Sequence, residues 1–432
     1  MAESFPNPEA IREVQLHSLN ELLREIVPAN AFYTRKILEV SAPREYNDLA
    51  DFQRAFPITT KDELARDQEQ HPLYGRNLTY PLERYSRFHQ TSGTSGKPLR
   101  WLDTPESWET LVQCWLEVFR AAGVTQKDST YFAFSFGPFL GFWLAFDAGA
   151  RLGTLCIPGG GLSTVGRLKT ILETRATVLC CTPSYAIHLA DAAKQENIDL
   201  AQGKVRLIIV AGEPGGSLPA TRAHIERLWP GARVFDHHGM TETGPITYEC
   251  PAQPCRLHIV HWAYFAEVID PTTAEPAETG TTGELVVTTL KRTGSPLIRY
   301  RTGDLVRLAA HHAEGRPCAC GRYDLALEGG ILGRTDDMIV VRGVNIYPTA
   351  VEQIIREFQE VAEYQVHITK RGALSDLHIV VEPARDAKNI AALVASIEKS
   401  LQTSFSLRIP VTTAAQNSLP RAELKAKRWI RK

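Results

Sequence analysis

Apolar residues recur at helical spacing through the first third of the chain. Residues 11–26 form one such run, and a second helix is expected over residues 30–38. Residues 59–64 place Asp and Glu just after threonine, as at a helix start. Thr104-Pro105 has the residue types of an N-cap and a first helical position. One helical face is expected to follow, formed by Trp108, Leu111, Val112, Trp115 and Phe119.

Short apolar runs then alternate with helical periods. Strands are expected over residues 131–136, 178–182, 205–210 and 233–236, with helices over 184–195 and 218–229. Such alternation is typical of a parallel sheet covered by helices. The most apolar stretch, residues 131–146, is too short for a bilayer and is interrupted by Gly137, Pro138 and Gly141. It is expected to form a strand, a loop and a buried helix.

The pattern changes beyond Gly244, where β-type runs dominate. Strands are expected over residues 257–269, 283–290, 297–301 and 305–308. The chain then ends in a small α+β unit, with helices expected over 349–358 and 387–403 and strands over 363–369, 377–382 and 407–411. The expected fold class is α/β. We expect an N-terminal domain over residues 1–335, with a β-rich subdomain at about 245–332, and a small C-terminal domain over 336–432.

Composition narrows the class of protein. The 432 residues are 44% hydrophobic and 22% charged, with a net charge of −1, so no basic field attracts nucleic acid or anionic membrane. The N-terminus lacks a charged segment followed by an apolar core, so no signal peptide is predicted. Eight cysteines without a framework spacing suit a reducing compartment. We therefore expect a cytoplasmic protein without a membrane or nucleic-acid partner.

One loop, residues 91–98, reads Thr-Ser-Gly-Thr-Ser-Gly-Lys-Pro. Its glycines allow several backbone N–H groups to face one anion, and its hydroxyls and lysine add donors and positive charge. The spacing is not that of a Walker A loop, which has four residues between its glycines. These residues alone fit either a polyphosphate loop or a flexible turn.

Two further loops follow predicted strands, where ligands bind in open α/β sheets. The first is residues 211–215, Ala-Gly-Glu-Pro-Gly, and the second is residues 238–244, His-Gly-Met-Thr-Glu-Thr-Gly. Thr241 beside Glu242 suits a phosphate with Mg²⁺, which prefers one or two carboxylates together with phosphate oxygens. The alternative is an N-cap threonine with a glutamate in the first helical turn.

Three polar stretches lie further along. Asp304 is placed to accept both hydroxyls of a ribose, or else to form a hairpin turn with Gly303. Residues 333–346 combine Arg334 with two aspartates between the predicted domains, where a surface linker is the alternative. The tail, residues 419–428, reads Leu-Pro-Arg-Ala-Glu-Leu-Lys-Ala-Lys-Arg and has the composition of a solvated basic segment.

In this order, the stretches resemble those of the acyl-adenylate-forming (AMP-forming) enzymes, and in particular the phenylacetate–coenzyme A ligases. The resemblance covers the chain from about residue 85 to its end, and includes Glu249-Cys250, Leu-His-Ile at 257–259 and Gly-Val-Asn-Ile-Tyr-Pro at 343–348. It implies two steps: a carboxylic acid attacks the α-phosphate of ATP, giving an acyl-adenylate and pyrophosphate, and the thiol of coenzyme A then displaces AMP.

The resemblance also implies a nucleotide site. The first loop would hold the β- and γ-phosphates through Ser92, Gly93, Thr94, Ser95, Gly96 and Lys97. The rest of the nucleotide site would consist of Gly212, Glu213, Pro214, His237, His238, Gly239, Met240, Thr241, Asp304 and Arg334. Thr241 would contact the α-phosphate, Glu242 would bind Mg²⁺, and Asp304 would bind the ribose. His238 stands where the family usually has a tyrosine near adenine.

Two further roles concern the C-terminal domain. Asp336 falls at the family's hinge, about which the small domain rotates between the two steps. Lys425 matches the lysine that bridges the carboxylate and the α-phosphate. Lys427 is the alternative, since Leu424 replaces the usual glycine before the catalytic lysine.

An aromatic-rich loop, residues 134–141, bears on the acid. With neighbouring motifs it is expected to form an apolar slot lined by Phe136, Phe139, Ala211, Gly212 and His237. Such a slot fits a flat aromatic acid better than acetate or a long fatty chain. Packing in the core is the alternative for each phenylalanine.

Cysteines and a histidine form two short clusters. Cys250, Cys255 and His258 lie within nine residues, and Cys318 and Cys320 follow about 60 residues later. Thiolates with imidazole favour zinc, and a closed tetrahedral set would be structural. The expected ligands are Cys250, His258, Cys318 and Cys320, with Cys255 as a substitute for His258 and free buried thiols as the alternative.

The combined expectation is an AMP-forming aryl–coenzyme A ligase that uses ATP, Mg²⁺ and coenzyme A and holds a structural Zn²⁺. An adenylating enzyme that loads a carrier protein is the runner-up. A nucleotide-binding protein without catalysis is the alternative from a different class. A homodimer is expected by analogy alone.

Overall fold

The computed structural model describes residues 5–91, 97–313, 315–342, 344–371, 374–421 and 426–431. The chain divides into two compact units. The first comprises Met1–Asp128, Ser135–Cys156 and His237–Gly330, and the second comprises Ser129–Phe134, Ile157–Asp236 and Ile331–Lys432. The predicted domain boundary at residues 335 and 336 stays a prediction.

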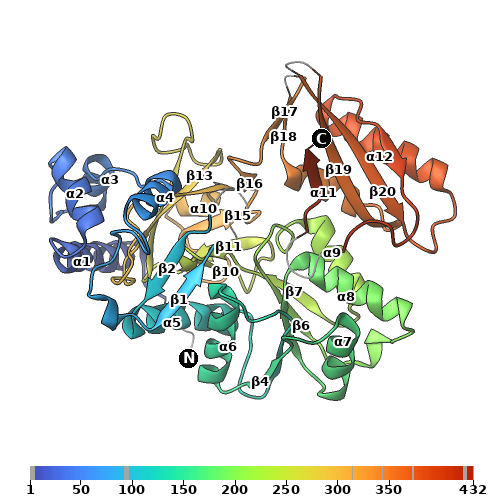
Figure 1. The fold of residues 1–432 in the computed structure, drawn as a ribbon, viewed down its shortest axis with the longest axis horizontal. Coiled ribbons are helices and arrows are strands. Elements are labelled where there is room, and N and C mark those ends of the chain that lie inside the picture. The colour runs from blue at the N-terminus through green and yellow to red at the C-terminus, as the bar shows by residue number, and fades with distance from the viewer. Residues whose placement is uncertain are drawn as a thin grey trace. The chain divides into compact units, whose positions relative to one another are not determined.

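The first unit begins with helices whose starts are fixed by side-chain caps. They are α1 (Pro8–Ile26), α2 (Ala31–Val40), α3 (Leu49–Ala55), α4 (Lys61–Gln70) and α5 (Pro105–Ala121). Thr60 and Glu63 form a capping box at the start of α4, and Thr104 caps α5 with Pro105 at its first position. The predicted helices here are thus confirmed, and Figure 1 shows them in blue, with α5 in cyan.

Strands complete the first unit. They form the antiparallel hairpin β1 (Arg87–Gln90) with β2 (Arg100–Asp103), the short pair β8 (Gly239–Met240) with β9 (Gly244–Pro245), and the set β10 (Thr247–Glu249), β11 (Arg256–Ile259) and β15 (Ala326–Glu328). A further antiparallel set joins β12 (Tyr264–Ile269), β13 (Thr282–Thr289) and β14 (Tyr300–Arg307). Helices α6 (Leu140–Leu152) and α10 (Ala310–Ala313) also belong to this unit.

Two predictions about these strands were wrong. The run over 257–269 divides into β11 and β12, because a turn closed by the hydrogen bond from Ala263 N–H to the Val260 carbonyl lies between them. The predicted turn at Gly303 is instead a bulge inside one continuous strand, β14. There Gly303 has φ of +77°, and three residues of β14 lie opposite Leu285.

The second unit holds the predicted parallel sheet. Its strand order is β4-β3-β5-β6-β7, with β3 (Ser129–Phe132), β4 (Leu155–Pro158), β5 (Val178–Cys181), β6 (Leu207–Val210) and β7 (Arg233–Asp236). Helices α7 (Thr164–Glu173), α8 (Pro183–Gln195) and α9 (Pro219–Leu228) pack their apolar residues on these strands (Figure 1). Continuous buried runs in β5 and β6 reflect coverage on both faces.

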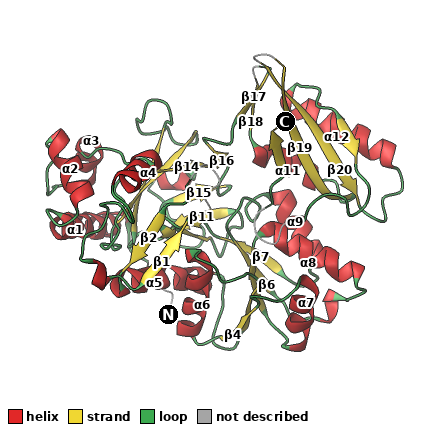
Figure 2. Cartoon of the chain, viewed as in Figure 1, coloured by secondary structure: helices red, strands yellow, loops and turns green. Residues whose placement is uncertain are grey.

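The chain ends in a mixed sheet with two helices. The strand order is β18-β17-β20-β19-β22, with β21 also paired to β20. Figure 2 shows the long antiparallel pair of this sheet, β19 and β20. The bounds of its elements are β17 (Ile339–Val341), β18 (Val344–Ile346), α11 (Pro348–Arg356), β19 (Val361–Arg371), β20 (Leu374–Pro383), α12 (Ile390–Phe405), β21 (Val411–Thr413) and β22 (Trp429–Arg431). The short strand β16 (Gly333–Arg334) precedes this sheet and is not part of it. Among the described residues, no helix combines the length and apolar composition needed to cross a bilayer.

Candidate active site

The predicted phosphate loop closes the β1–β2 hairpin. Gln90 pairs with Arg100, and two hydrogen bonds of 2.9 Å then join Thr91 and Leu99: the Thr91 N–H donates to the Leu99 carbonyl, and the Leu99 N–H donates to Thr91 Oγ1. Ser92 to Gly96 lie outside the described residues. Lys97 is exposed, and its Nζ lies 3.4 Å from Glu69 Oε1. A surface ion pair of this kind is weak, so an incoming anion could break it at little cost in free energy.

Thr241 and Glu242 form the turn between β8 and β9. The alternative of an N-cap at a helix start is therefore wrong. Gly244 has φ of +87°, and a Cβ there would lie 2.4 Å from Leu111 Cδ2, so only glycine fits.

Arg292 ties this turn to the phosphate-loop hairpin. Its Nη1 donates to the carbonyls of Thr241 (3.3 Å) and Glu242 (2.6 Å). Its Nε and Nη2 donate to the two carboxylate oxygens of Asp103, at the end of β2, at 2.7 and 2.8 Å. Both side chains are buried, so this two-point pair fixes the turn against β2. Sequence reasoning missed Arg292, because its partners are far away in the chain.

Lys61 also reaches this turn. It is the first residue of α4, and its Nζ lies 3.2 Å from Oε1 of the buried Glu242. The sequence signalled a helix start here but gave no sign that the lysine meets Glu242. A cation therefore already lies beside the carboxylate predicted to bind Mg²⁺.

His238 and Asp304, both predicted for the nucleoside, lie together. His238 Nε2 is 2.9 Å from Asp304 Oδ2, and the Asp304 side chain is 4% exposed. The bulge in β14 sets the aspartate, and the His238 N–H donates to Thr247 Oγ1 at 2.8 Å. His238 and Asp304 are therefore brought together by two separate backbone features, the bulge in β14 and the hydrogen bond of the His238 N–H.

His237 is buried beside Trp115. The ring centroids are 4.0 Å apart in an edge-to-face arrangement, and neither ring nitrogen has a hydrogen-bond partner among the described residues. Burial lowers the pKa of His237 to about 3, so the imidazole is neutral at physiological pH. An uncharged imidazole at this position is compatible with a site that binds the apolar part of a carboxylic acid.

The predicted aromatic loop packs on α6. Phe136 lies 4.9 Å from Trp143 and 5.6 Å from Phe146, and Phe139 lies 5.8 Å from Phe142, measured between ring centroids. The loop is tied to the phosphate hairpin, since the Gln90 N–H donates to the Pro138 carbonyl at 2.9 Å. The three rings of α6 were missed, because their helical spacing resembles that of ordinary core residues.

In the second unit, the loop after β6 contains Gly212 with φ of +91° and Gly215 with φ of +152°. A Cβ on Gly216 would lie 2.4 Å from Asp236 Cγ, so the loop lies directly on the end of β7. Glu213 Oε1 accepts a hydrogen bond from the Ser184 N–H at 2.8 Å and another from Ser184 Oγ. These contacts hold the loop against the start of α8.

The other predicted residues of the second unit are partly described. Arg334 Nε donates to Asp336 Oδ1 at 2.9 Å, so the predicted ribose–phosphate arginine pairs with the predicted hinge residue. Lys425 lies outside the described residues, and Lys427 is exposed.

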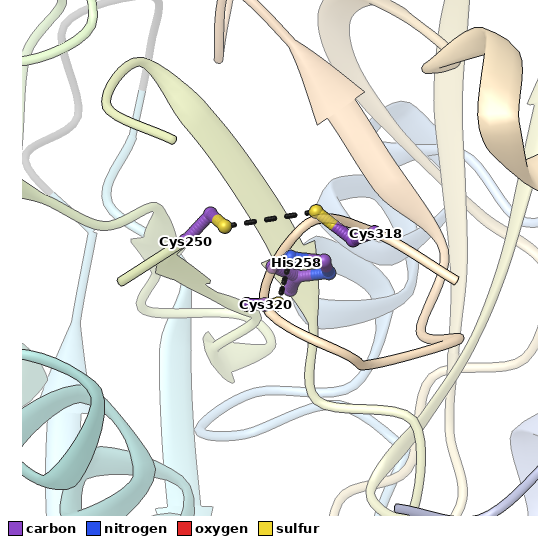
Figure 3. A group of neighbouring side chains, drawn as sticks. All are labelled: Cys250, His258, Cys318 and Cys320. Carbon is purple, nitrogen blue, oxygen red and sulfur yellow. Dashed lines mark hydrogen bonds between the residues drawn. The ribbon is translucent and has the colours of Figure 1, made fainter. Parts of the chain in front are cut away.

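Four predicted zinc ligands converge in the first unit. Cys250 follows β10, His258 lies on β11, and Cys318 and Cys320 come from the loop before β15 (Figure 3). Their ligand atoms all lie within 4.8 Å of one another. The Sγ atoms of Cys250 and Cys318 are 3.7 Å apart, and Cys320 Sγ is 3.4 Å from His258 Nε2.

Cys255 is not in this group; its N–H donates to Glu249 Oε1 at 2.7 Å. The hydrogen bond from Cys250 lowers the pKa of Cys320 to about 2 and raises the pKa of Cys250. Burial alone would lower the pKa of His258, but hydrogen bonds to Cys318 and Cys320 raise it to about 9. These shifts favour a thiolate at Cys320 beside an imidazolium at His258.

Comparisons with known proteins agree with this geometry. Residues 89–290 match the AMP-binding enzyme family, and residues 343–432 match the AMP-binding enzyme C-terminal domain. A phenylacetate-coenzyme A ligase of Pseudomonas putida is 30% identical over 97% of this chain and 93% of its own length. One from Thermus thermophilus is 32% identical over 88% of this chain and 83% of its own.

A solved structure is also similar. The structure of 2-hydroxyisobutyryl-CoA ligase in complex with 2-HIB-AMP matches with a TM-score of 0.92 and 26% identity, covering 99% of this chain and 91% of that one. The chain belongs to the phenylacetate–coenzyme A ligase family of AMP-binding enzymes, which convert a carboxylic acid to an acyl-adenylate and then to a coenzyme A thioester.

Proposed function

We propose that the acid activated by this ligase is aromatic. The observation that carries this proposal is the cluster of rings formed by Phe136, Phe139, Phe142, Trp143 and Phe146. Aromatic side chains pack favourably edge to face with another flat ring. The hydrogen bond from Gln90 to Pro138 connects this cluster to the residue next to the phosphate loop. The acid would thus meet ATP at the end of the aromatic loop.

The proposed roles of the nucleotide-site residues follow the sequence motifs of the family. Residues 92–97 would hold the β- and γ-phosphates, Thr241 the α-phosphate, and Asp304 the ribose. Glu242 has the carboxylate that Mg²⁺ prefers beside phosphate oxygens, and the ion would neutralise charge that develops on the leaving pyrophosphate. His238 would lie against the adenine.

Loop residues complete the nucleotide site. Gly212, Pro214, Gly239 and Met240 would let the backbone approach the nucleotide closely, and His237 would close the inner end of the acid slot. Glu213, which was also predicted for the nucleotide site, belongs to the same loop as Gly212 and Pro214.

We also propose a mobile C-terminal domain over residues 336–432, with its hinge at Asp336. Lys425 would neutralise the acid carboxylate and the α-phosphate in the first step and leave for the second. The pairing of Arg334 with Asp336 supports this role, because a hinge residue held by one exposed ion pair is free to change its backbone angles.

The four-residue cluster would hold a structural zinc ion. Tetrahedral zinc with Zn–S bonds of about 2.3 Å and Zn–N bonds of about 2.0 Å separates two sulfurs by about 3.8 Å, and a sulfur and a nitrogen by about 3.5 Å. The spacings of 3.7 Å between Cys250 and Cys318, and 3.4 Å between Cys320 and His258, agree with these values. Bound there, the ion would join β10, β11 and the loop before β15.

The eight cysteines, which lack the spacing of a disulfide framework, support a reducing compartment such as the cytoplasm. Coenzyme A is the proposed acceptor, and a carrier protein remains the second candidate because both present a thiol.

A panel of acids tests the aromatic assignment. Pyrophosphate release would be measured with benzoates, phenylacetates, hydroxycinnamates, heteroaryl acids and short fatty acids, with and without coenzyme A. We expect release with an aromatic acid, and Phe136→Ala should raise its KM while leaving the KM for ATP unchanged. Higher kcat/KM with an aliphatic acid would overturn the assignment. Release without free thioester would favour a carrier protein.

A further inference from the structure

The segment of the chain just before Lys425 is held by several hydrogen bonds. The N–H groups of Asn417 and Leu419 donate to the two carboxylate oxygens of Glu382 at 2.9 and 3.0 Å, and Arg421 pairs with the same carboxylate. Glu382 lies on β20, so these contacts join the tail to its own small domain.

Contacts of the same kind hold the tail after Lys425. Arg428 donates to Glu363 at 2.7 Å and to Glu352 at 3.3 Å, and β22 then pairs with β19. All of these partners lie within residues 336–432. They would move with the small domain, so they cannot by themselves bring the lysine to the nucleotide loop.

One contact does connect the tail to the nucleotide loop. The Ala426 N–H donates to Glu213 Oε2 at 3.0 Å. Glu213 Oε1 is occupied by the N–H and the hydroxyl of Ser184, in the first turn of α8. The carboxylate is therefore anchored at a helix N-terminus, where negative charge is favoured, and its second oxygen faces the tail.

We propose that Glu213 is a positioning residue for the first step: it holds the backbone N–H of Ala426 and so places Lys425, the preceding residue. This inference rests on the proposed role of Lys425. It differs from a nucleotide contact, because both carboxylate oxygens of Glu213 already accept hydrogen bonds from protein donors. A carboxylate would also repel the phosphates of ATP.

A single hydrogen bond suits a contact that must break in every cycle. A bond to a charged acceptor biases the closed arrangement. Two further hydrogen bonds join the small domain to the neighbouring helices, from Gln195 Nε2 to Asn417 Oδ1 at 3.1 Å and from the Ala220 N–H to Gln353 Oε1 at 3.2 Å, but neither involves the nucleotide loop. In this proposal the bond from Ala426 to Glu213 belongs to the arrangement used for adenylate formation. Its removal should slow the first step and spare the second.

The test separates the two half-reactions. In Glu213→Gln and Glu213→Ala, acid-dependent pyrophosphate release should fall about 10- to 100-fold, the loss expected for one charge-assisted hydrogen bond. Thioester formation from supplied acyl-adenylate and the KM for ATP should both stay at wild-type values. Glu226→Gln is the matched control, because Glu226 also accepts a backbone N–H, from Val234 at 2.9 Å.

The donor of this hydrogen bond, the Ala426 N–H, is tested by a separate substitution. Lactic acid in place of Ala426, introduced by nonsense suppression, replaces the amide by an ester and removes only the N–H. It should reproduce the loss, and combined with Glu213→Gln it should cause no further loss, because both changes remove the same bond.

Three results would overturn the proposal. A higher KM for ATP with normal kcat would make Glu213 a nucleotide ligand. Equal losses in both half-reactions would make its role structural. Additive losses in the double variant would show that it acts elsewhere than on Ala426. If the wild type released no pyrophosphate with any acid, the proposed function itself would fail, which is a distinct outcome.

Discussion

The Nζ of Lys61 lies 3.2 Å from Oε1 of Glu242, where the first residue of α4 meets the turn between β8 and β9. Glu242 is buried and Lys61 is partly exposed. The carboxylate thus has a cationic partner before any nucleotide arrives. If Mg²⁺ and phosphates bind at this turn as proposed, the same ammonium group would lie close enough to share their charge.

Lys61→Ala should therefore slow pyrophosphate release by about tenfold or more, because a preorganised positive charge is lost beside the leaving group. Lys61→Arg should retain part of the rate. Lys291→Ala is the matched control, since Lys291 pairs with Glu21 on the surface at 3.1 Å. Rates of Mg²⁺-dependent release check this, and an unchanged rate in Lys61→Ala would contradict it.

Asp304→Asn should raise the KM for ATP by about tenfold, because a charged acceptor for the ribose hydroxyls is weakened. The wild type should also prefer ATP to 2′-deoxy-ATP, and the variant should lose most of that preference. Steady-state kinetics with both nucleotides test the assignment. An undiminished preference would show that the ribose is bound elsewhere.

Lys425→Ala should abolish adenylate formation and leave thioester formation from supplied acyl-adenylate largely intact, because the proposed role of the lysine is confined to the first step. Lys427→Ala serves as the comparison and should retain both. Loss of the first step in Lys427→Ala alone would transfer the role to Lys427.

Metal analysis should find about one zinc per chain. Cys320→Ser and His258→Ala should lose the metal and melt at a lower temperature, because the proposed ion would join three parts of the β-rich region. Cys255→Ser and Cys156→Ser should keep it, since neither belongs to the cluster. A metal-free, fully stable wild type would contradict the assignment.

Stability should depend on Glu352 at low pH. Burial alone would raise the pKa of Glu352, but the guanidinium groups of Arg428 and Arg356 lower it from 4.5 to about 2. A lowered pKa contributes stability that is complete above pH 4.5 and is lost as pH falls toward 2. This lowering of the pKa of Glu352 corresponds to about 3 kcal/mol of folding free energy.

Glu352→Gln should accordingly be less stable than wild type at pH 7, with a gap that narrows between pH 4.5 and pH 3. Urea denaturation at each pH measures the gap. A gap that stays constant over this range would contradict the assigned cause.

Local sequence signals predicted most of the fold. Thr60 and Thr104 identified helix starts, and the buried runs of β5 and β6 identified parallel strands, because caps and periodicity depend on neighbours in the chain. The bulge at Gly303 was predicted as a turn, since the same glycine satisfies either backbone.

Site residues could be predicted where a short sequence motif contains residue types with a specific chemical role. The convergence of Cys250, His258, Cys318 and Cys320 was predicted because cysteine and histidine are rare residues and specific metal ligands. Arg292 and Lys61 were missed, because each meets its partner across a long chain separation with no local signature. The contact of Glu213 with Ala426 is likewise a product of tertiary structure.

The central claim is two-step activation of an aromatic acid, and one quench experiment tests it most directly. The wild type would be mixed with ATP, Mg²⁺ and the preferred aromatic acid, first without coenzyme A and then with it, and the products quantified by mass spectrometry. We expect acyl-adenylate and pyrophosphate to appear first in equal amounts. Coenzyme A should then convert the adenylate to thioester and AMP, one for one. Thioester formed with ADP and phosphate, or without a detectable adenylate, would contradict the account.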